Sequence, residues 1–120
     1  MPQKDEHINW AKHDRDFWTS IDLDSTPFTD WVVTGMFYET VHWVEAFLAT
    51  KSHHSTAHAE RKTNIVSYEL ELRPIWKDYI QLERDSRNAR YLCYLHTAEQ
   101  VRRDLIPRVD RIKDHISQLL

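Results

Sequence analysis

The chain has very little of the residue types on which disulfide frameworks and β-turns depend. Its 120 residues include one cysteine (Cys93), one glycine and four prolines. A single cysteine excludes an intramolecular disulfide and is typical of proteins from reducing compartments. So few turn-forming residues argue against a fold built from hairpins. Five tryptophans, five tyrosines and four phenylalanines supply bulky core material instead.

The sequence also lacks signals for export or membrane insertion. Its N-terminus, MPQKDEHINW, has no basic segment followed by an apolar one. The longest apolar segment is interrupted by Glu39, His42 and Glu45, and charged side chains are costly in the middle of a bilayer. We therefore expect a cytoplasmic protein that makes no membrane contact.

That segment, residues 27–51, is predicted to form a long buried helix at the centre of the domain. Thr26 can cap its start by accepting a backbone hydrogen bond, Pro27 suits the first helical position, and Asp30 complements the helix dipole. Apolar side chains occur on nearly every side, as is typical of a helix packed among other helices.

Shorter helices are predicted on both sides of the central one. The first covers residues 5–21, and Pro74 is expected to interrupt the helical pattern around residues 72–73. Pro107 predicts a bend in the last helix, where apolar residues recur at steps of three and four: Ala98, Val101, Leu105, Val109, Ile112, Ile116 and Leu119. We therefore predict one all-α domain, residues 1–120, forming an antiparallel four- to five-helix bundle.

Histidines gather at the end of the central helix and in the segment that follows it. His42 lies on the predicted helix, and His53, His54 and His58 come after it. Zinc would need three or four such ligands, but the sequence has no HExxH motif and no cysteine pair. We therefore expect no metal and no cofactor, and hydrogen bonds to local backbone are the simpler interpretation.

Arginines precede a histidine later in the chain. Arg84, Arg87 and Arg90 are followed by His96. Arginine offers a planar fork of donors suited to phosphate, and histidine exchanges protons near neutral pH. Together they could cleave RNA without a metal ion. The alternative is structural, with the arginines paired to nearby carboxylates and the apolar YLCYL between Arg90 and His96 packed inside the protein.

Charge is unevenly distributed along the sequence. Residues 84–113 carry eight lysines and arginines against four acidic residues, a balance of +4, while the whole chain has a net charge of −3. Such a basic section could meet an anionic partner such as RNA. It could equally be the solvated face of an amphipathic helix.

Several short patterns together resemble the HEPN (higher eukaryotes and prokaryotes nucleotide-binding) family. The runs GMFYETVHWVEAFLATKSHHSTAHAERKTNI, YIQLERDSRNARYL and AEQV carry the resemblance, over about residues 8–119. Three groups of residues match in order: Phe37, Tyr38, His42, Ala46 and Leu48 on the central helix; His54, His58 and Arg61 after it; and Ser86, Arg87, Ala89, Arg90 and Tyr91 in the late element.

The resemblance implies a helical bundle, frequent dimerisation, and roles in toxin–antitoxin, antiphage or RNA-processing systems. Many HEPN proteins are metal-independent ribonucleases with an R-x(4–6)-H motif, and Arg90 and His96, with five residues between them, satisfy that spacing. Two positions depart from the family pattern: Tyr91 replaces a polar residue, and Ala98 stands where a tyrosine is familiar. These departures favour a member without nuclease activity.

We therefore expect a HEPN-like module that binds a nucleotide, RNA or a partner protein, with these contact residues: His42, His54, His58, Arg61, Arg87, Arg90 and Tyr91. Arg90 and His96 are catalytic only if the alternative, a dimeric ribonuclease, holds. A third hypothesis is a helical oligomerisation protein without a ligand. The expected partners are a second copy of the chain and a nucleotidyltransferase-type antitoxin. The bundle is expected to bring the histidine-rich segment close to the SRNARY element.

Overall fold

The computed structural model describes residues 1–120, and the chain is helical without any strand. The elements in chain order are α1 (Lys4–Thr19), α2 (Thr29–Thr50), α3 (His58–Ser67), α4 (Glu69–Tyr91), α5 (Ala98–Gln100), a π-helical turn (Val101–Leu105) and α6 (Ile106–Leu119). Because α5, the π turn and α6 follow one another without a break, they form one final helix. The predicted all-α bundle of four to five helices is therefore confirmed.

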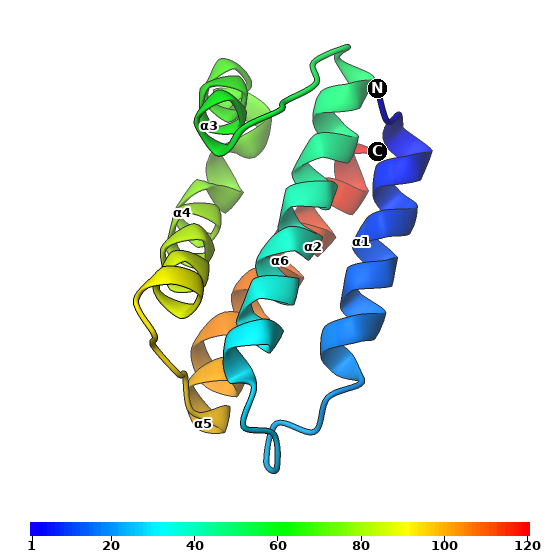
Figure 1. Ribbon diagram of the computed structural model, residues 1–120. Helices are drawn as coiled ribbons and strands as arrows, with labels where there is room; N and C mark the ends of the chain where they lie inside the picture. The colour runs from blue at the N-terminus through cyan, green and yellow to red at the C-terminus, as the bar shows by residue number, and fades with distance from the viewer.

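The long helices alternate in direction along the bundle (Figure 1). α2 occupies the middle and packs against α1, α4 and α6, while α4 also packs against α6. The short α3 lies near the C-terminal end of α2, beside the start of α4. The resulting molecule is elongated, with extents of 41 × 24 × 23 Å. None of its helices combines the length and the apolar character needed to cross a membrane.

The central helix has the predicted position but a different start. Its N-cap residue is Phe28 rather than Thr26, and no side chain caps it. The Thr26 hydroxyl does accept a backbone hydrogen bond, from the N–H of Phe28 at 3.0 Å, but it does so in the connection before the helix. Pro27 therefore lies outside α2 rather than in its first turn.

A buried carboxylate lies inside the core that α2 builds. Glu39 has no exposed surface. Its two oxygens accept hydrogen bonds from the indole N–H of Trp18 at 2.7 Å, the indole N–H of Trp43 at 2.9 Å and Nε of Arg15 at 3.0 Å. Arg15 also donates to Asp110 on α6 at 2.9 Å. The polar residue that interrupts the apolar run therefore ties α1, α2 and α6 together.

Pro74 does not break a helix, contrary to the prediction. The interruption comes earlier, at Tyr68, where α3 ends and α4 begins, and Pro74 lies inside α4. Proline removes the hydrogen bond to the carbonyl four residues back, here that of Leu70. Leu70 is 93% exposed, so water can reach this part of the helix and replace the lost bond.

The final helix contains a π turn directly before Pro107. The N–H of Ile106 donates to the carbonyl of Val101, five residues back, whereas an α-helix pairs residues four apart. Pro107 has no N–H with which to continue regular pairing at this point. We predicted a bend at Pro107, and the irregularity that the structure contains is this wider turn one residue before it.

Candidate functional site

Polar side chains from α2, α3 and α4 meet along one side of the bundle. This polar seam consists of Tyr38 and Glu45 on α2, His58, Arg61 and Lys62 on α3, and Glu83, Arg87 and Arg90 on α4. The histidine-rich segment approaches the SRNARY element as predicted, because His58 and Arg90 meet at Tyr38: the ring centroid of His58 lies 6.4 Å from that of Tyr38, and NH1 of Arg90 donates to the Tyr38 hydroxyl at 2.9 Å. The ion pair between Lys62 and Glu83 also joins α3 to α4 at 3.0 Å.

Arg61 forms the buried end of the polar seam. It is 7% exposed, and its Nε donates to Glu45 at 2.7 Å while its NH1 lies 2.9 Å from Nδ1 of His58. Burial raises the pKa of the neighbouring Tyr79 to about 12, although the Arg61 guanidinium opposes this shift. Arg61 is one of the residues expected to contact a ligand, and its Nε and NH1 are used by internal partners, so it anchors α3 to α2.

His58 is a neutral member of the polar seam near pH 7. Burial lowers its pKa, and the positive charges of Arg61 and Arg90 lower it further. A neutral imidazole that accepts from Arg61 through Nδ1 carries its proton on Nε2. The positive charge of the seam therefore comes from its arginines and from Lys62.

Glu83 is shared by two basic side chains. The ammonium of Lys62 lies 3.0 Å from its Oε1, and NH2 of Arg87 lies 3.4 Å from the same oxygen. The second oxygen, Oε2, is buried without a hydrogen-bond partner. One carboxylate therefore faces two cations, which leaves the middle of the polar seam with excess positive charge.

Arg90 is the seam arginine without a carboxylate partner. Its NH1 donates to the Tyr38 hydroxyl at 2.9 Å, and its Nε lies 3.3 Å from the Ser86 carbonyl. The guanidinium carbon lies 5.6 Å from the ring centroid of Tyr38, 5.8 Å from that of Phe37 and 5.1 Å from that of Tyr91. Aromatic rings thus hold a guanidinium in place beside Tyr91, whose side chain is 69% exposed.

His42 and His54 lie apart from Arg90, toward α1. Nδ1 of His42 is 3.0 Å from Nδ1 of His7, and its Nε2 is 3.8 Å from Asp14. Burial, His7 and Arg61 lower the pKa of His42 to about 4, whereas burial raises the pKa of Asp14 to about 6. His54 precedes α3 in a non-helical connection, and its buried Nδ1 has no partner.

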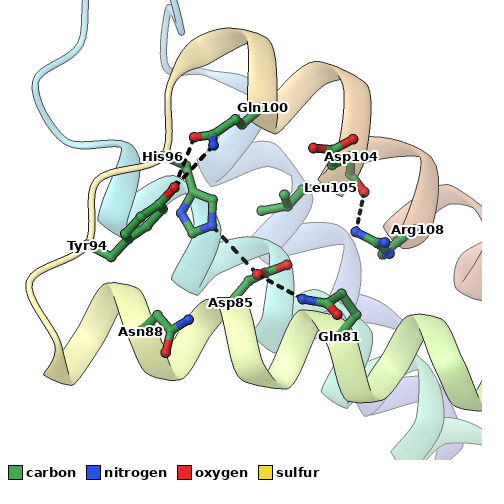
Figure 2. A pocket seen from close by; sticks show the side chains of 9 residues that line it. All are labelled: Gln81, Asp85, Asn88, Tyr94, His96, Gln100, Asp104, Leu105 and Arg108. Carbon is green, nitrogen blue, oxygen red and sulfur yellow. Dashed lines mark hydrogen bonds and ion pairs between the residues drawn. The ribbon is translucent and has the colours of Figure 1, made fainter.

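His96 lies at a different surface from Arg90. It is 7% exposed, and its Nε2 is 3.7 Å from Asp85. It lines a cleft of about 570 Å³ between α4 and the final helix (Figure 2), and Arg90 is not among the lining residues. Within one protomer the two proposed catalytic side chains therefore do not share a site.

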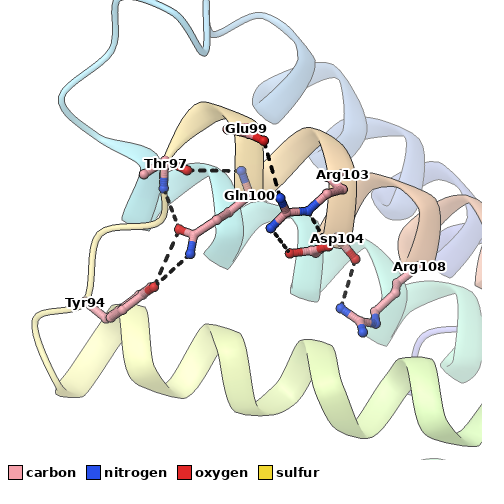
Figure 3. Close-up of polar contacts among 7 residues, drawn as sticks. All are labelled: Tyr94, Thr97, Glu99, Gln100, Arg103, Asp104 and Arg108. Atoms are coloured by element: carbon pink, nitrogen blue, oxygen red, sulfur yellow. Dashed lines mark hydrogen bonds and ion pairs between the residues drawn. The ribbon is translucent and has the colours of Figure 1, made fainter.

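The connection between α4 and α5 separates these two residues. α4 ends at Tyr91, and Cys93 has a positive φ of 57°. The Tyr94 hydroxyl accepts from Nε2 of Gln100 at 3.1 Å, and Thr97 and Gln100 form a reciprocal capping box (Figure 3). The expected packing of the YLCYL segment is wrong, because residues 91–95 are all exposed.

Sequence reasoning missed the cleft and, in the seam, Lys62, which looks like an ordinary charge on a helix face. The expected structural pairing of the arginines with nearby carboxylates is confirmed for Arg87, which lies 3.4 Å from Glu83. Gln81, Asp85 and Asn88 recur at steps of four and three, a spacing that places polar groups on one face of α4 and was the available signal. No group of three or more histidine, cysteine or acidic side chains is placed to hold a metal ion.

No protein-family model, curated protein or solved structure matches this chain.

Proposed function

We propose that the chain is a HEPN-like helical module that binds single-stranded RNA along the polar seam without cutting it. The observation that carries this proposal is Arg90, a guanidinium held among aromatic rings, without a carboxylate partner, beside the exposed ring of Tyr91. Single-strand binders combine cations for the phosphates with aromatic rings on which bases stack. Arg90 and Tyr91 supply one of each.

The charge balance of the polar seam supports an anionic ligand. Four cations, Arg61, Lys62, Arg87 and Arg90, lie among two carboxylates, Glu45 and Glu83. Arg61 and Glu45 neutralise each other in the interior. The accessible remainder is positive, and phosphate is an anion that the arginine fork fits in two-point geometry.

The separation of Arg90 from His96 supports binding without cleavage. General acid–base catalysis needs the histidine within hydrogen-bond reach of the reacting group. In one protomer, His96 lines the cleft beside Asp85, whereas Arg90 contacts α2 through Tyr38. A ribonuclease would need a second copy to bring an arginine to His96.

Fluorescence anisotropy with a labelled uridine oligonucleotide tests RNA binding. We expect Arg90→Ala and Tyr91→Ala each to weaken binding by about tenfold, since stacking of one base on an aromatic side chain contributes about 1–3 kcal/mol. Affinity should fall steeply as salt rises, with a shallower slope for Arg90→Ala. Arg73→Ala is the matched control, because Arg73 is exposed at the opposite end of α4 and pairs only with Glu69.

Two outcomes would contradict this proposal. Binding that ignores both salt and Arg90→Ala would exclude the polar seam as an RNA site. Cleavage of the oligonucleotide in EDTA, lost in both Arg90→Ala and His96→Ala, would establish the ribonuclease alternative instead. Far-ultraviolet circular dichroism of each variant confirms that the helices remain formed.

A homodimer is a second candidate assembly, because large aromatic side chains are exposed on α1 and before and within α2. Trp10 is 53% exposed, Phe28 57% and Trp31 58%, and aromatic residues are enriched at protein interfaces. Sedimentation velocity of the free protein in the same buffer reports its mass. A dimer that binds no RNA would favour the oligomerisation hypothesis.

A nucleotidyltransferase-type antitoxin partner remains part of the HEPN-like proposal, and the identity of the neighbouring genes tests it.

A further inference from the structure

Two rows of polar side chains face each other across the cleft beside His96 (Figure 2). Gln81, Asp85 and Asn88 come from α4, and Gln100, Asp104 and Arg108 come from the final helix. Packed helices normally bury apolar side chains between them, yet only two of the nine residues that line this cleft are hydrophobic. Its volume of about 570 Å³ is in the range of small-molecule sites. A polar lining of this size points to a polar ligand.

The cleft contains hydrogen-bonding groups that the protein does not use. The side-chain amide of Asn88 makes no hydrogen bond, and the Gln81 amide uses only its N–H, which donates to Oδ1 of Asp85 at 3.1 Å. The other Asp85 oxygen, Oδ2, has no partner. His96 is buried, and its Nδ1 also has no hydrogen-bond partner. A buried polar atom such as Nδ1 of His96 normally has a partner in native proteins, and the unused groups of Asn88, Gln81 and Asp85 lie on partly exposed side chains that a ligand can reach.

By contrast, the charged residues of the opposite row already have partners. Asp104 accepts from Arg103 through both oxygens at 3.1 Å, and Arg108 donates to the Asp104 carbonyl at 2.9 Å (Figure 3). Arg108 also lies 3.7 Å from Asp78. The hydrogen-bonding groups of the cleft that have no partner are therefore concentrated on α4, where the carboxylate of Asp85 lies near the primary amide of Asn88.

We propose that this cleft binds a guanine base through its Watson–Crick edge, with Asp85 and Asn88 as the contacts. That edge presents two adjacent N–H donors beside a carbonyl acceptor. A carboxylate can accept two parallel N–H bonds, and a primary amide can donate to the carbonyl. Asp85 and Asn88 are three residues apart on α4, so their Cβ atoms lie about 5–6 Å apart on one face, and both groups can reach the same edge.

The other bases fit this pair of groups less well. Adenine places a ring acceptor, N1, where guanine has a donor, and this lone pair would face the Asp85 carboxylate. Uracil offers one donor between two acceptors. A guanidinium ion shares the two parallel donors of guanine but has no acceptor for the Asn88 amide. The arrangement of unused groups therefore favours guanine among ligands with paired N–H donors.

This assignment goes beyond the proposed function and does not depend on it. Arg90 is not part of the cleft, and guanosine carries no phosphate for the polar seam to bind. Loss of RNA binding in Arg90→Ala should therefore leave guanosine binding unchanged. The two proposals can fail separately.

Titration of the protein with guanosine, monitored by side-chain amide resonances in nitrogen-15 NMR, tests the proposal. We expect shifts in the Asn88 and Gln81 amide signals, and a dissociation constant at least about tenfold lower for guanosine than for adenosine. Asp85→Asn should weaken guanosine binding by about tenfold or more, because it turns an acceptor into a donor. Asp114→Asn, at an exposed aspartate of α6, should not change it.

Asn88→Ala provides a second variant, because the Asn88 amide holds nothing in the fold and its loss should weaken guanosine binding at least about threefold. The proposal is overturned if guanosine causes no shift at about 1 mM, or if both variants bind it as the wild type does. It is also overturned if agmatine, which carries a guanidinium, shifts the same signals while guanosine does not.

Discussion

At the scale of single residues, the stability of the bundle depends most sharply on Glu39. It is a fully buried carboxylate with three donors: the indoles of Trp18 and Trp43 and the guanidinium of Arg15. Removing one partner of a buried ion pair typically costs about 3–5 kcal/mol, because the remaining charge loses its compensation. We expect Glu39→Gln to lower the free energy of unfolding by about 3 kcal/mol, as measured by urea denaturation.

Asp110→Asn is the matched control for Glu39→Gln. Asp110 also bonds Arg15, at 2.9 Å, but its side chain is 46% exposed. Exposed ion pairs contribute about 0–1 kcal/mol, so the loss should stay below about 1 kcal/mol. Equal losses in the two variants would contradict the distinction between the buried and the exposed partner of Arg15.

Asp14 should make stability depend on pH in a direction opposite to that of most carboxylates. Burial raises its pKa from 3.8 to about 6, so between these values the folded state binds more protons than the unfolded state. Stability is therefore lost as pH rises through about 6. A shift of about two units corresponds to about 3 kcal/mol, reduced to about 1–2 kcal/mol because the side chain is partly exposed.

Asp14→Asn removes this loss. The free energy of unfolding of the variant, relative to that of the wild type, should rise by about 1–2 kcal/mol from about pH 4 to about pH 7.5. Urea denaturation at both pH values measures this change. His42 has a pKa of about 4, which costs stability below its ordinary value of 6.5, and its Nε2 lies 3.8 Å from Asp14. The same substitution made in a His42→Gln background therefore isolates Asp14. Asp16→Asn, at an exposed position of α1, is the control. If the stability difference between Asp14→Asn and the wild type were the same at about pH 4 and about pH 7.5, the destabilising effect of the Asp14 charge would be contradicted.

At the scale of helices, sequence patterns predicted which segments are helical better than where each helix starts. The apolar run of α2 and the steps of three and four in the final helix mark real helices. The start of α2 differs because Thr26 bonds the N–H of Phe28 in a local turn, and this alternative to capping is not visible in residue types. The break between α3 and α4 at Tyr68 is not visible in residue types either, because no proline or glycine marks it.

Pro74 offers a direct test of what a proline inside a helix costs this protein. Because it lies inside α4 rather than at a break, Pro74→Ala restores a backbone donor to the Leu70 carbonyl. We expect stability to rise by about 1 kcal/mol, less than the full penalty of about 3 kcal/mol for an interior proline, since the wild-type helix already accommodates the ring. Urea denaturation measures the change.

Pro27→Ala serves as the opposite case. Pro27 lies in the connection between α1 and α2, where its ring restricts the unfolded chain without removing a helical hydrogen bond. This substitution should lower stability by up to about 1 kcal/mol. A loss of stability in Pro74→Ala would show that the helix depends on the proline.

At the scale of the whole molecule, the bundle follows from local patterns, whereas the polar groupings depend on tertiary placement. Helical periodicity and the burial of α2 are encoded within short windows of sequence. The approach of α3 to α4 was also predictable, since the final turn of α2 delivers the histidine-rich segment there. The separation of Arg90 from His96 was not, because it depends on where α4 ends and on how residues 92–97 turn.

The π turn also has a consequence for how insertions and deletions act on this protein. It accommodates one more residue than a regular α-helical turn, so a chain one residue shorter between positions 101 and 105 would form a continuous α-helix. Because the wider π turn and the α turn that would replace it each complete about one revolution, the residues after such a deletion would keep their orientation around the helix axis. Arg108 would still face the cleft opposite Asp85 and Asn88. A related sequence that is one residue shorter in this segment can therefore retain both walls of the cleft, whereas a one-residue deletion in a regular stretch of helix before Arg108 would turn it by about 100°, the angle per residue of an α-helix.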